Sequence, residues 1–121
     1  MADRDIMVWG EIPVTDMEKS VAFYCKVFGY EMEIDHSGPN PMANLGGVMN
    51  TAGAHLYPGK PAADGGNTIH LALPDALEAG MARCTAAGGE IVSPPITIPA
   101  GRFAYAKDLD GNSIGLFEAA S

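Results

Sequence analysis

Residues 6–29, IMVWGEIPVTDMEKSVAFYCKVFG, join a short β-forming run to an amphipathic helical pattern. Residues 6–13 are rich in β-forming side chains, and successive side chains of a strand point to opposite faces. This alternation puts Trp9 and Glu11 on one face and the apolar Ile12 on the other. The segment therefore predicts a strand that leads directly into a helix.

The helix is predicted over residues 16–28. Its apolar face is formed by Met17, Val21, Tyr24 and Phe28. Thr15 and Glu18 have the spacing of a capping box, in which two side chains satisfy the free amides at a helix start. Gly29 stands where a left-handed C-terminal cap is needed. These signals predict one helix packed on a sheet.

A second helical pattern repeats the first at a shift of 60 residues. The matched pairs are Met17 with Leu77, Val21 with Met81, Tyr24 with Cys84 and Gly29 with Gly89. The strand-like run TIHLAL, residues 68–73, precedes this second helix, as residues 6–13 precede the first. A shift of about half the chain predicts an internal duplication.

Short strands are predicted after each helix. The first half offers residues 30–36, 42–45 and 53–57, and the second half offers 90–92, 102–107 and 113–118. Residues 108–112, DLDGN, have the Asp-Gly pair of a hairpin turn. Residues 58–66 read as an internal connection. We therefore predict one α+β domain over residues 1–121, built from two βαβββ half-repeats at about 1–60 and 61–121.

Composition narrows the class of protein. The formal net charge of −8 opposes binding to phosphate backbones and anionic lipids, so neither nucleic acid nor a membrane is expected as a partner. Cys25 and Cys84 have no metal-type spacing and are predicted to be free thiols. Residues 1–7 contain no long apolar run, so no secretory signal is expected. These features predict a cytoplasmic protein.

Two longer segments resemble one known family. They are EIPVTDMEKSVAFYCKVFGYEME, residues 11–33, and AAGGEIVSPPITIPAGRFAYAKDLDGNSIGLFE, residues 86–118. The order of "VTDME", "AFY", "VFG", "AAGG", "GRFA" and "DLDGNSIGL" is similar to that of the vicinal oxygen chelate superfamily, which includes glyoxalases, bleomycin-resistance proteins and ring-cleaving dioxygenases. The resemblance spans nearly the whole chain.

The resemblance implies a curved mixed sheet whose concave side forms a cup, often completed across a homodimer. In metal-dependent members, His, Glu or Gln side chains hold a divalent ion in this cup. The positions that correspond to three of these ligands carry Trp9, then Thr68 or Ile69, and Gly115. None of these is a good donor, so the usual metal ligands are missing.

Other polar residues are expected in the cup. Glu11 precedes Asp16 by five residues and His70 precedes Asp75 by five, so the two occupy equivalent places in the half-repeats. His55 lies on a predicted strand and is a candidate third member. Glu11, His55 and His70 are one hypothesis for a displaced site for Ni, Zn, Mn or Fe.

Two further hypotheses need no metal. The first is a cup that binds a cationic or aromatic small molecule; its side chains are Trp9, Glu11, His55, His70, Phe103 and Tyr105. The second uses Glu11 as a general base beside His70 in proton transfer on a carbonyl compound. The sequence favours small-molecule binding without a cofactor, with a metal-dependent lyase, isomerase or dioxygenase as the alternative and the metal-free base as a third reading.

Overall fold

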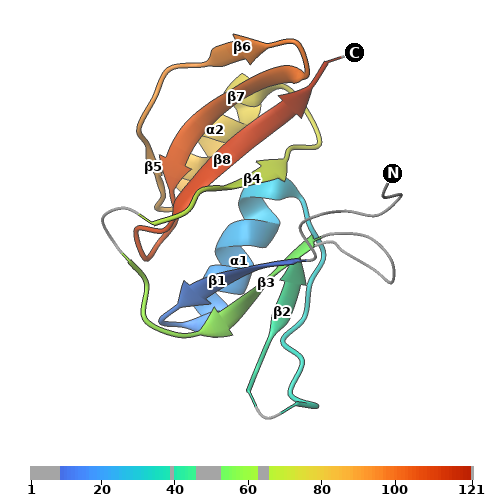
Figure 1. Ribbon diagram of the computed structural model, residues 1–121, viewed down its shortest axis with the longest axis vertical. Helices are drawn as coiled ribbons and strands as arrows, with labels where there is room; N and C mark the ends of the chain where they lie inside the picture. Colours follow the sequence, from blue (N-terminus) through green and yellow to red (C-terminus); the bar gives the residue numbers. More distant parts are fainter. Residues whose placement is uncertain (1–8, 39, 46–52, 63–65, 121) are drawn as a thin grey trace, which may run out of the picture.

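The computed structural model describes residues 9–38, 40–45, 53–62 and 66–120 (Figure 1). The first half contains β1 (Trp9–Val14), α1 (Met17–Phe28), β2 (Ala43–Leu45) and β3 (Gly53–Pro58). The second half contains β4 (Ile69–Ala72), α2 (Leu77–Ala86), β5 (Glu90–Ile91), β6 (Ile96–Ile98), β7 (Gly101–Lys107) and β8 (Ser113–Ala119).

Among the described residues, the two halves share the pairing of their first and last strands, although the first sheet has three strands and the second has five. The first sheet has the order β1-β3-β2, and the second has the order β4-β8-β7-β5 with β6 added alongside β7. In each half the first strand runs parallel to the last strand, and the remaining pairs are antiparallel. The register pairs Glu11 with His55 in one half and His70 with Gly115 in the other. This mixed α+β architecture confirms the predicted pair of half-repeats.

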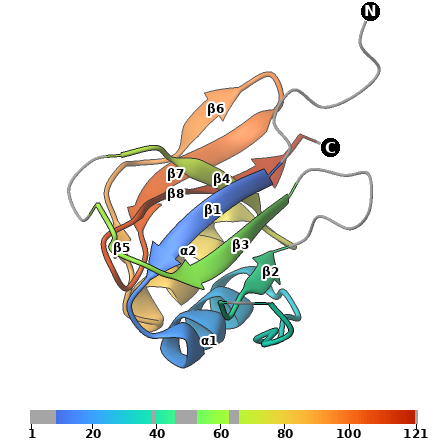
Figure 2. The ribbon, with the colours of Figure 1, turned by 60° about the horizontal axis from the view of Figure 1, so that its bottom comes forward.

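Both helices pack against the same side of the strands (Figure 2). α1 and α2 also contact each other, so the core lies between the helices and the two sheets. Its largest fully buried side chains are Tyr24, Phe28, Leu56, Leu77, Ile114, Leu116, Val14, Val27 and Cys84. Because strand side chains alternate, the residues between the buried ones point to the side without helices, which we call the open face.

A buried polar network ties the β7–β8 turn to the first half. Asp108, only 6% exposed, accepts hydrogen bonds from the backbone amides of Asp110 and Asn112, both at 2.9 Å. The Tyr24 hydroxyl donates to Asp108 Oδ2 over 2.7 Å, and Asn112 Nδ2 donates to the Pro13 carbonyl over 2.7 Å. The predicted turn at residues 108–112 is therefore confirmed, and it also fixes the end of β1.

The helix boundaries agree with prediction, but the first cap does not. Asp16 caps α1 by accepting a hydrogen bond from the Lys19 amide over 3.0 Å, so the predicted capping box is wrong. Thr15 is held elsewhere, because its hydroxyl donates to Asp110 Oδ1 over 2.5 Å. Gly29 has the expected positive φ of 74°.

Two strand predictions need correction. Residues 30–36 form no strand and make a single bridge between Asp35 and Met42. The Asp35 side chain accepts from the Ser37 amide over 2.8 Å, and this local turn ends the pairing. β6 was not predicted, because Ile96–Ile98 is short and lies beside two prolines.

The two cysteines lie on the two helices. Cys25 and Cys84 are both free and lie on α1 and α2. No helix within residues 9–38, 40–45, 53–62 and 66–120 is long and apolar enough to cross a membrane.

Candidate functional site

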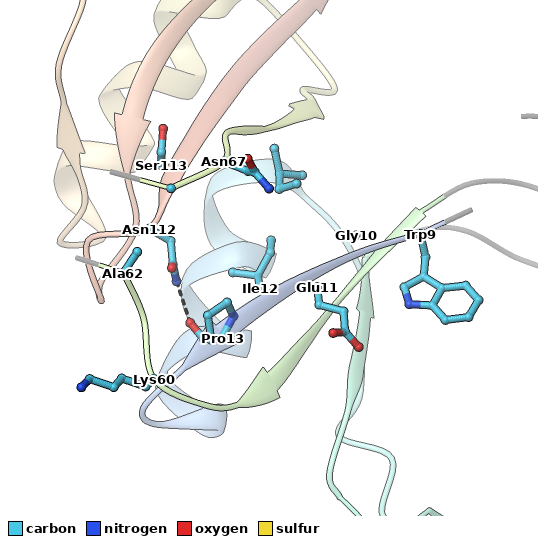
Figure 3. Close-up of a pocket in the computed structure, with 12 residues that line it drawn as sticks. Trp9, Gly10, Glu11, Ile12, Pro13, Lys60, Ala62, Asn67, Asn112 and Ser113 are labelled. Carbon is cyan, nitrogen blue, oxygen red and sulfur yellow. Dashed lines mark hydrogen bonds between the residues drawn. The ribbon is translucent and has the colours of Figure 1, made fainter. Parts of the chain in front are cut away.

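A cavity of about 700 Å³ lies between β1 and the segments that begin β4 and β8 (Figure 3). Its apolar lining comes from Trp9, Ile12, Pro13, Ala62 and Ile69. Its polar lining comes from Glu11, Lys60, Asn67, Asn112 and Ser113. The cavity has the size of a small-molecule site, and it mixes apolar surface with a few polar groups.

The strand pairing of the first half positions one end of this cavity. Trp9 and Glu11 are on the open face of β1, where Trp9 is 60% exposed. His55 is the register partner of Glu11 on β3, and its Nε2 lies 3.0 Å from Glu11 Oε2. The His55 side chain is only 12% exposed, whereas that of Glu11 is 56% exposed. The histidine therefore orients a carboxylate that stays open to solvent.

The other predicted residues gather on the second sheet. The rings of His70, Phe103 and Tyr105 form three edge-to-face pairs, with centroids 5.1 to 5.7 Å apart. Edge-to-face packing at these distances is favourable because the positive edge of one ring meets the negative face of another. Tyr105 is 37% exposed. The six predicted site residues thus form two groups, both on the open face but on different sheets.

The arrangement does not form the predicted metal site of Glu11, His55 and His70. Glu11 pairs with His55 in the first sheet, whereas His70 packs on aromatic rings in the second. Within the described ranges, no group of three or more His, Cys, Asp or Glu side chains is close enough to hold an ion. The pairing of Glu11 with His70 for proton transfer stays a prediction; the imidazole that bonds to Glu11 in the structure is that of His55.

The positions that the resemblance marks as metal ligands do not fit an ion either. Trp9 offers no lone pair suited to a metal, and Gly115 has no side chain. A Cβ added at Gly115 would lie 2.0 Å from His70 Nδ1, so the imidazole occupies the space that a ligand side chain would need. The donor set of this chain therefore does not match the metal centre that the resemblance implies.

Sequence reasoning missed four polar residues of the cavity: Lys60, Asn67, Asn112 and Ser113. Asn112 is the last residue of the DLDGN turn. Lys60 lies within the predicted connection, residues 58–66, and Asn67 directly follows it. Asn112 carries the clearest signal, because an asparagine at the end of a tight turn often bonds to backbone. The other three come together only when the halves pack.

The clearest pKa shifts lie away from the cavity. Burial raises the pKa of Cys84 to about 11 and that of Tyr30 to about 12. Burial, followed by the nearby Asp108 charge, raises the pKa of Tyr24 well above its usual value. Hydrogen bonds from Arg102 lower the pKa of Glu78 to about 2. These shifts come from core packing and from ion pairs beside α2.

Comparison with known proteins places the chain in a family. The model for the Glyoxalase/Bleomycin resistance protein/Dioxygenase superfamily matches residues 6–116. CFP32 of Mycobacterium bovis, a protein provisionally named a glyoxylase, is 30% identical over 92% of this chain. The match covers 44% of CFP32, so the chain spans less than half the length of this relative.

Solved structures share the fold. A glyoxalase/bleomycin resistance protein from Albidiferax ferrireducens T118 aligns with a TM-score of 0.74 and 22% identity, covering 96% of this chain and all of that one. TnmS3, an antibiotic binding protein from Streptomyces sp. CB03234, aligns with a TM-score of 0.66 and 24% identity, covering 99% of this chain and all of that one. The chain therefore belongs to the Glyoxalase/Bleomycin resistance protein/Dioxygenase superfamily.

Proposed function

We propose that this chain binds a small organic molecule on its open face without a metal ion, and that the ligand is aromatic or cationic. The observation that carries the proposal is the Glu11–His55 pair at the edge of a 700 Å³ cavity, next to the exposed ring of Trp9. An exposed carboxylate beside an aromatic face attracts a cation through both charge and the ring quadrupole. The net charge of −8 adds a long-range attraction of the same sign.

A second group of rings lies on the open face of the other sheet. His70, Phe103 and Tyr105 offer flat apolar area on the neighbouring sheet. Aromatic residues contribute large contact areas to ligand sites. Their rings can stack on flat molecules of many kinds. A ligand with a flat part and a charged part would use both groups.

The antibiotic-binding role of TnmS3 supports this proposal by analogy of fold. A shared fold does not fix a shared ligand, because one scaffold carries many functions. An experiment that compares cationic, neutral and anionic aromatic compounds is therefore the first step toward the ligand of this chain.

A charge-matched panel tests the proposal. Methylquinolinium, naphthol and naphthalenesulfonate share a two-ring shape but are cationic, neutral and anionic. Trp9 is the one tryptophan of the chain, so its fluorescence reports on the cavity directly. We expect methylquinolinium to quench Trp9 and to bind tightest by calorimetry. We expect Glu11→Gln to weaken that binding about twofold to fivefold, the range set by an exposed pair of opposite charges.

Glu90→Gln is the matched control, because Glu90 lies exposed on β5 away from the cavity. Equal loss of affinity in both variants would point to general surface charge and would count against the site. Absence of binding by any of the three compounds, with Trp9 fluorescence unchanged, would contradict the proposal for this ligand class.

The alternative function is a metal-dependent lyase, isomerase or dioxygenase. Purification without a histidine tag, followed by elemental analysis and titration with Ni, Zn, Mn and Fe(II), distinguishes the two functions. A stoichiometric metal that is lost in Glu11→Ala or His70→Ala would favour the enzyme. Our proposal expects no stoichiometric metal in these preparations.

We also propose that the chain forms a homodimer and acts in the cytoplasm, as the family resemblance and the composition predicted. Sedimentation equilibrium measures the first point. A single species of 12.6 kDa across a wide concentration range would contradict the dimer.

A further inference from the structure

We infer that the cavity takes an elongated dipolar molecule, with a cationic group at the Glu11 end and an anionic group at the Lys60 end. The inference rests on the proposed small-molecule function and narrows its ligand class. Figure 3 shows Glu11 and Lys60, which line the same cavity, on opposite sides of Pro13, with Trp9 beyond Glu11.

The strand sets the distance between the two charges. The Gly59 amide donates to the Val14 carbonyl over 3.1 Å, so Lys60 follows one residue beyond the point where the chain leaves the end of β1. Glu11 is three residues earlier on that strand. A rise of about 3.3 Å per residue puts Glu11 about 10 Å from Val14, and Lys60 lies beyond Val14, so the two ends are separated by at least about 10 Å along the cavity.

Both charges are available to a ligand. His55 Nε2 bonds to Glu11 Oε2, and within residues 9–38, 40–45, 53–62 and 66–120 the other oxygen, Oε1, has no hydrogen-bond partner. Among the same residues, Lys60 makes no ion pair. Lys60 is notable because lysine and arginine together number only 7, against 15 acidic residues. A cation kept at one end of a cavity in an acidic protein offers a local place for an anion.

The wall between the two ends suits a neutral, partly polar linker. Asn67, Asn112 and Ser113 line one side, and Ile12, Pro13 and Ile69 contribute apolar surface. The Asn112 amide is already held by the Pro13 carbonyl and by Asp108, so this part of the wall is preorganised. Preorganised walls lower the ordering cost of binding.

A set of four straight-chain probes tests the inference by calorimetry at low salt. Aminooctanoate carries both charges at about the strand-derived spacing. Aminohexanoate carries both at a shorter spacing, octylamine carries the cation alone, and octanoate carries the anion alone. We expect aminooctanoate to bind about tenfold more tightly than each of the other three, since one charge-assisted contact at each end is worth about that factor.

Two variants assign each end. Lys60→Gln is expected to remove the preference for aminooctanoate over octylamine while keeping the preference over octanoate. Glu11→Gln is expected to remove the preference for aminooctanoate over octanoate while keeping the preference over octylamine. Lys19→Gln, an exposed cation on α1, is the control and is expected to change neither ratio. The fluorescence and melting temperature of each variant verify that it folds.

Equal affinities for all four probes, or equal effects of Lys60→Gln and Lys19→Gln, would overturn the inference. If methylquinolinium still binds in a Glu11-dependent way in that case, the proposed function stands and only the dipolar ligand class is lost. If neither methylquinolinium nor any straight-chain probe binds, both proposals fail together.

Discussion

The imidazole of His70 lies over Gly115, and a Cβ added at Gly115 would sit 2.0 Å from His70 Nδ1. The two residues are register partners in the parallel pair of β4 and β8. The equivalent pair in the first half is Glu11 and His55, where both residues carry side chains and bond to each other. The same pair of positions thus holds a hydrogen-bonded carboxylate and imidazole in one half, and an imidazole that lies over a glycine in the other.

This contact predicts the effect of Gly115→Ala. The added methyl group must push the His70 ring away from Phe103 and Tyr105, and each lost ring contact is worth about 0.5–1.5 kcal/mol. We expect a loss of about 1–2 kcal/mol in the free energy of unfolding, measured by urea titration. In a His70→Ala background the same substitution should cost much less, because the clash is gone. Additive losses in the double variant would show that the ring and the glycine do not interact.

The network beneath the β7–β8 turn predicts the effect of Tyr24→Phe. The Tyr24 hydroxyl is buried and donates to Asp108 over 2.7 Å, so its removal takes one donor from a buried carboxylate. We expect a loss of about 1–3 kcal/mol, or a drop of several degrees in melting temperature. Tyr105→Phe removes an exposed hydroxyl and serves as the control. Equal melting temperatures for Tyr24→Phe and Tyr105→Phe would contradict this role of the Tyr24 hydroxyl.

The ion pairs beside α2 predict how stability changes in acid. Arg102 donates to both oxygens of Glu78, and these hydrogen bonds lower the pKa of Glu78 from 4.5 to about 2. The Leu77 amide, followed by Arg102, lowers the pKa of Glu118. When the pKa of a carboxyl group is lower in the folded state than in the unfolded state, its ionised form stabilises the folded protein. This stabilisation is complete at pH values above the unfolded-state pKa. That stabilisation is lost as the pH falls from 4.5 toward 2.

Melting curves at several pH values check this prediction. We expect Glu78→Gln to melt below the wild type at neutral pH and to approach it as the pH falls toward 2, because the ion pair is then lost in both proteins. Glu90→Gln is the matched control. Parallel curves for wild type and Glu78→Gln would mean that the ion pair contributes nothing to acid sensitivity.

The two cysteines are predicted to differ in reactivity. Cys84 is fully buried, and burial raises the pKa of its thiol to about 11, whereas Cys25 is partly exposed. Because the thiolate is the reactive form, a disulfide-exchange reagent should label Cys25 in the folded protein and reach Cys84 only after unfolding. Mass spectrometry of the labelled peptides measures both. Equal labelling of the two thiols under native conditions would contradict the burial of Cys84.

The corrected cap of α1 gives a further prediction. Asp16→Ala removes the acceptor of the Lys19 amide and is expected to cost about 1 kcal/mol. Glu18→Ala should cost less, because a capping box at Thr15 is not formed. If Glu18→Ala were the more destabilising of the two, the capping box would have to be reinstated.

Much of the fold could be predicted because its signals are local. The helices follow from apolar spacing and from Gly29, and the β7–β8 hairpin follows from the Asp-Gly pair at residues 110–111. The failures arose where a side chain bonds to a distant or unforeseen partner. Thr15 bonds to Asp110, 95 residues away, and so does not cap the helix that begins beside it.

The site was harder to predict because its residues come from segments that are distant in the sequence. Glu11 and His55 are 44 residues apart and meet only through the register of a parallel strand pair. Periodicity shows which face a residue occupies, but it does not show which strand will be its neighbour. Glu11 and His70 occupy equivalent places in the repeat. Because each half forms its own sheet, these equivalent residues lie on different sheets. Lys60 and Asn67 line the same cavity as β1, and no local pattern in the sequence links them to that strand.

The polar network beneath the last turn also constrains the order in which the protein can mature during synthesis. Tyr24 and Pro13 leave the ribosome early, but their partners, Asp108 and Asn112, follow 84 and 99 residues later. A nascent first half therefore carries a core tyrosine and a strand end that await their partners until residues 108–112 have been translated. Such late closure is a window for chaperone binding, and slowing translation before codon 108 would lengthen it.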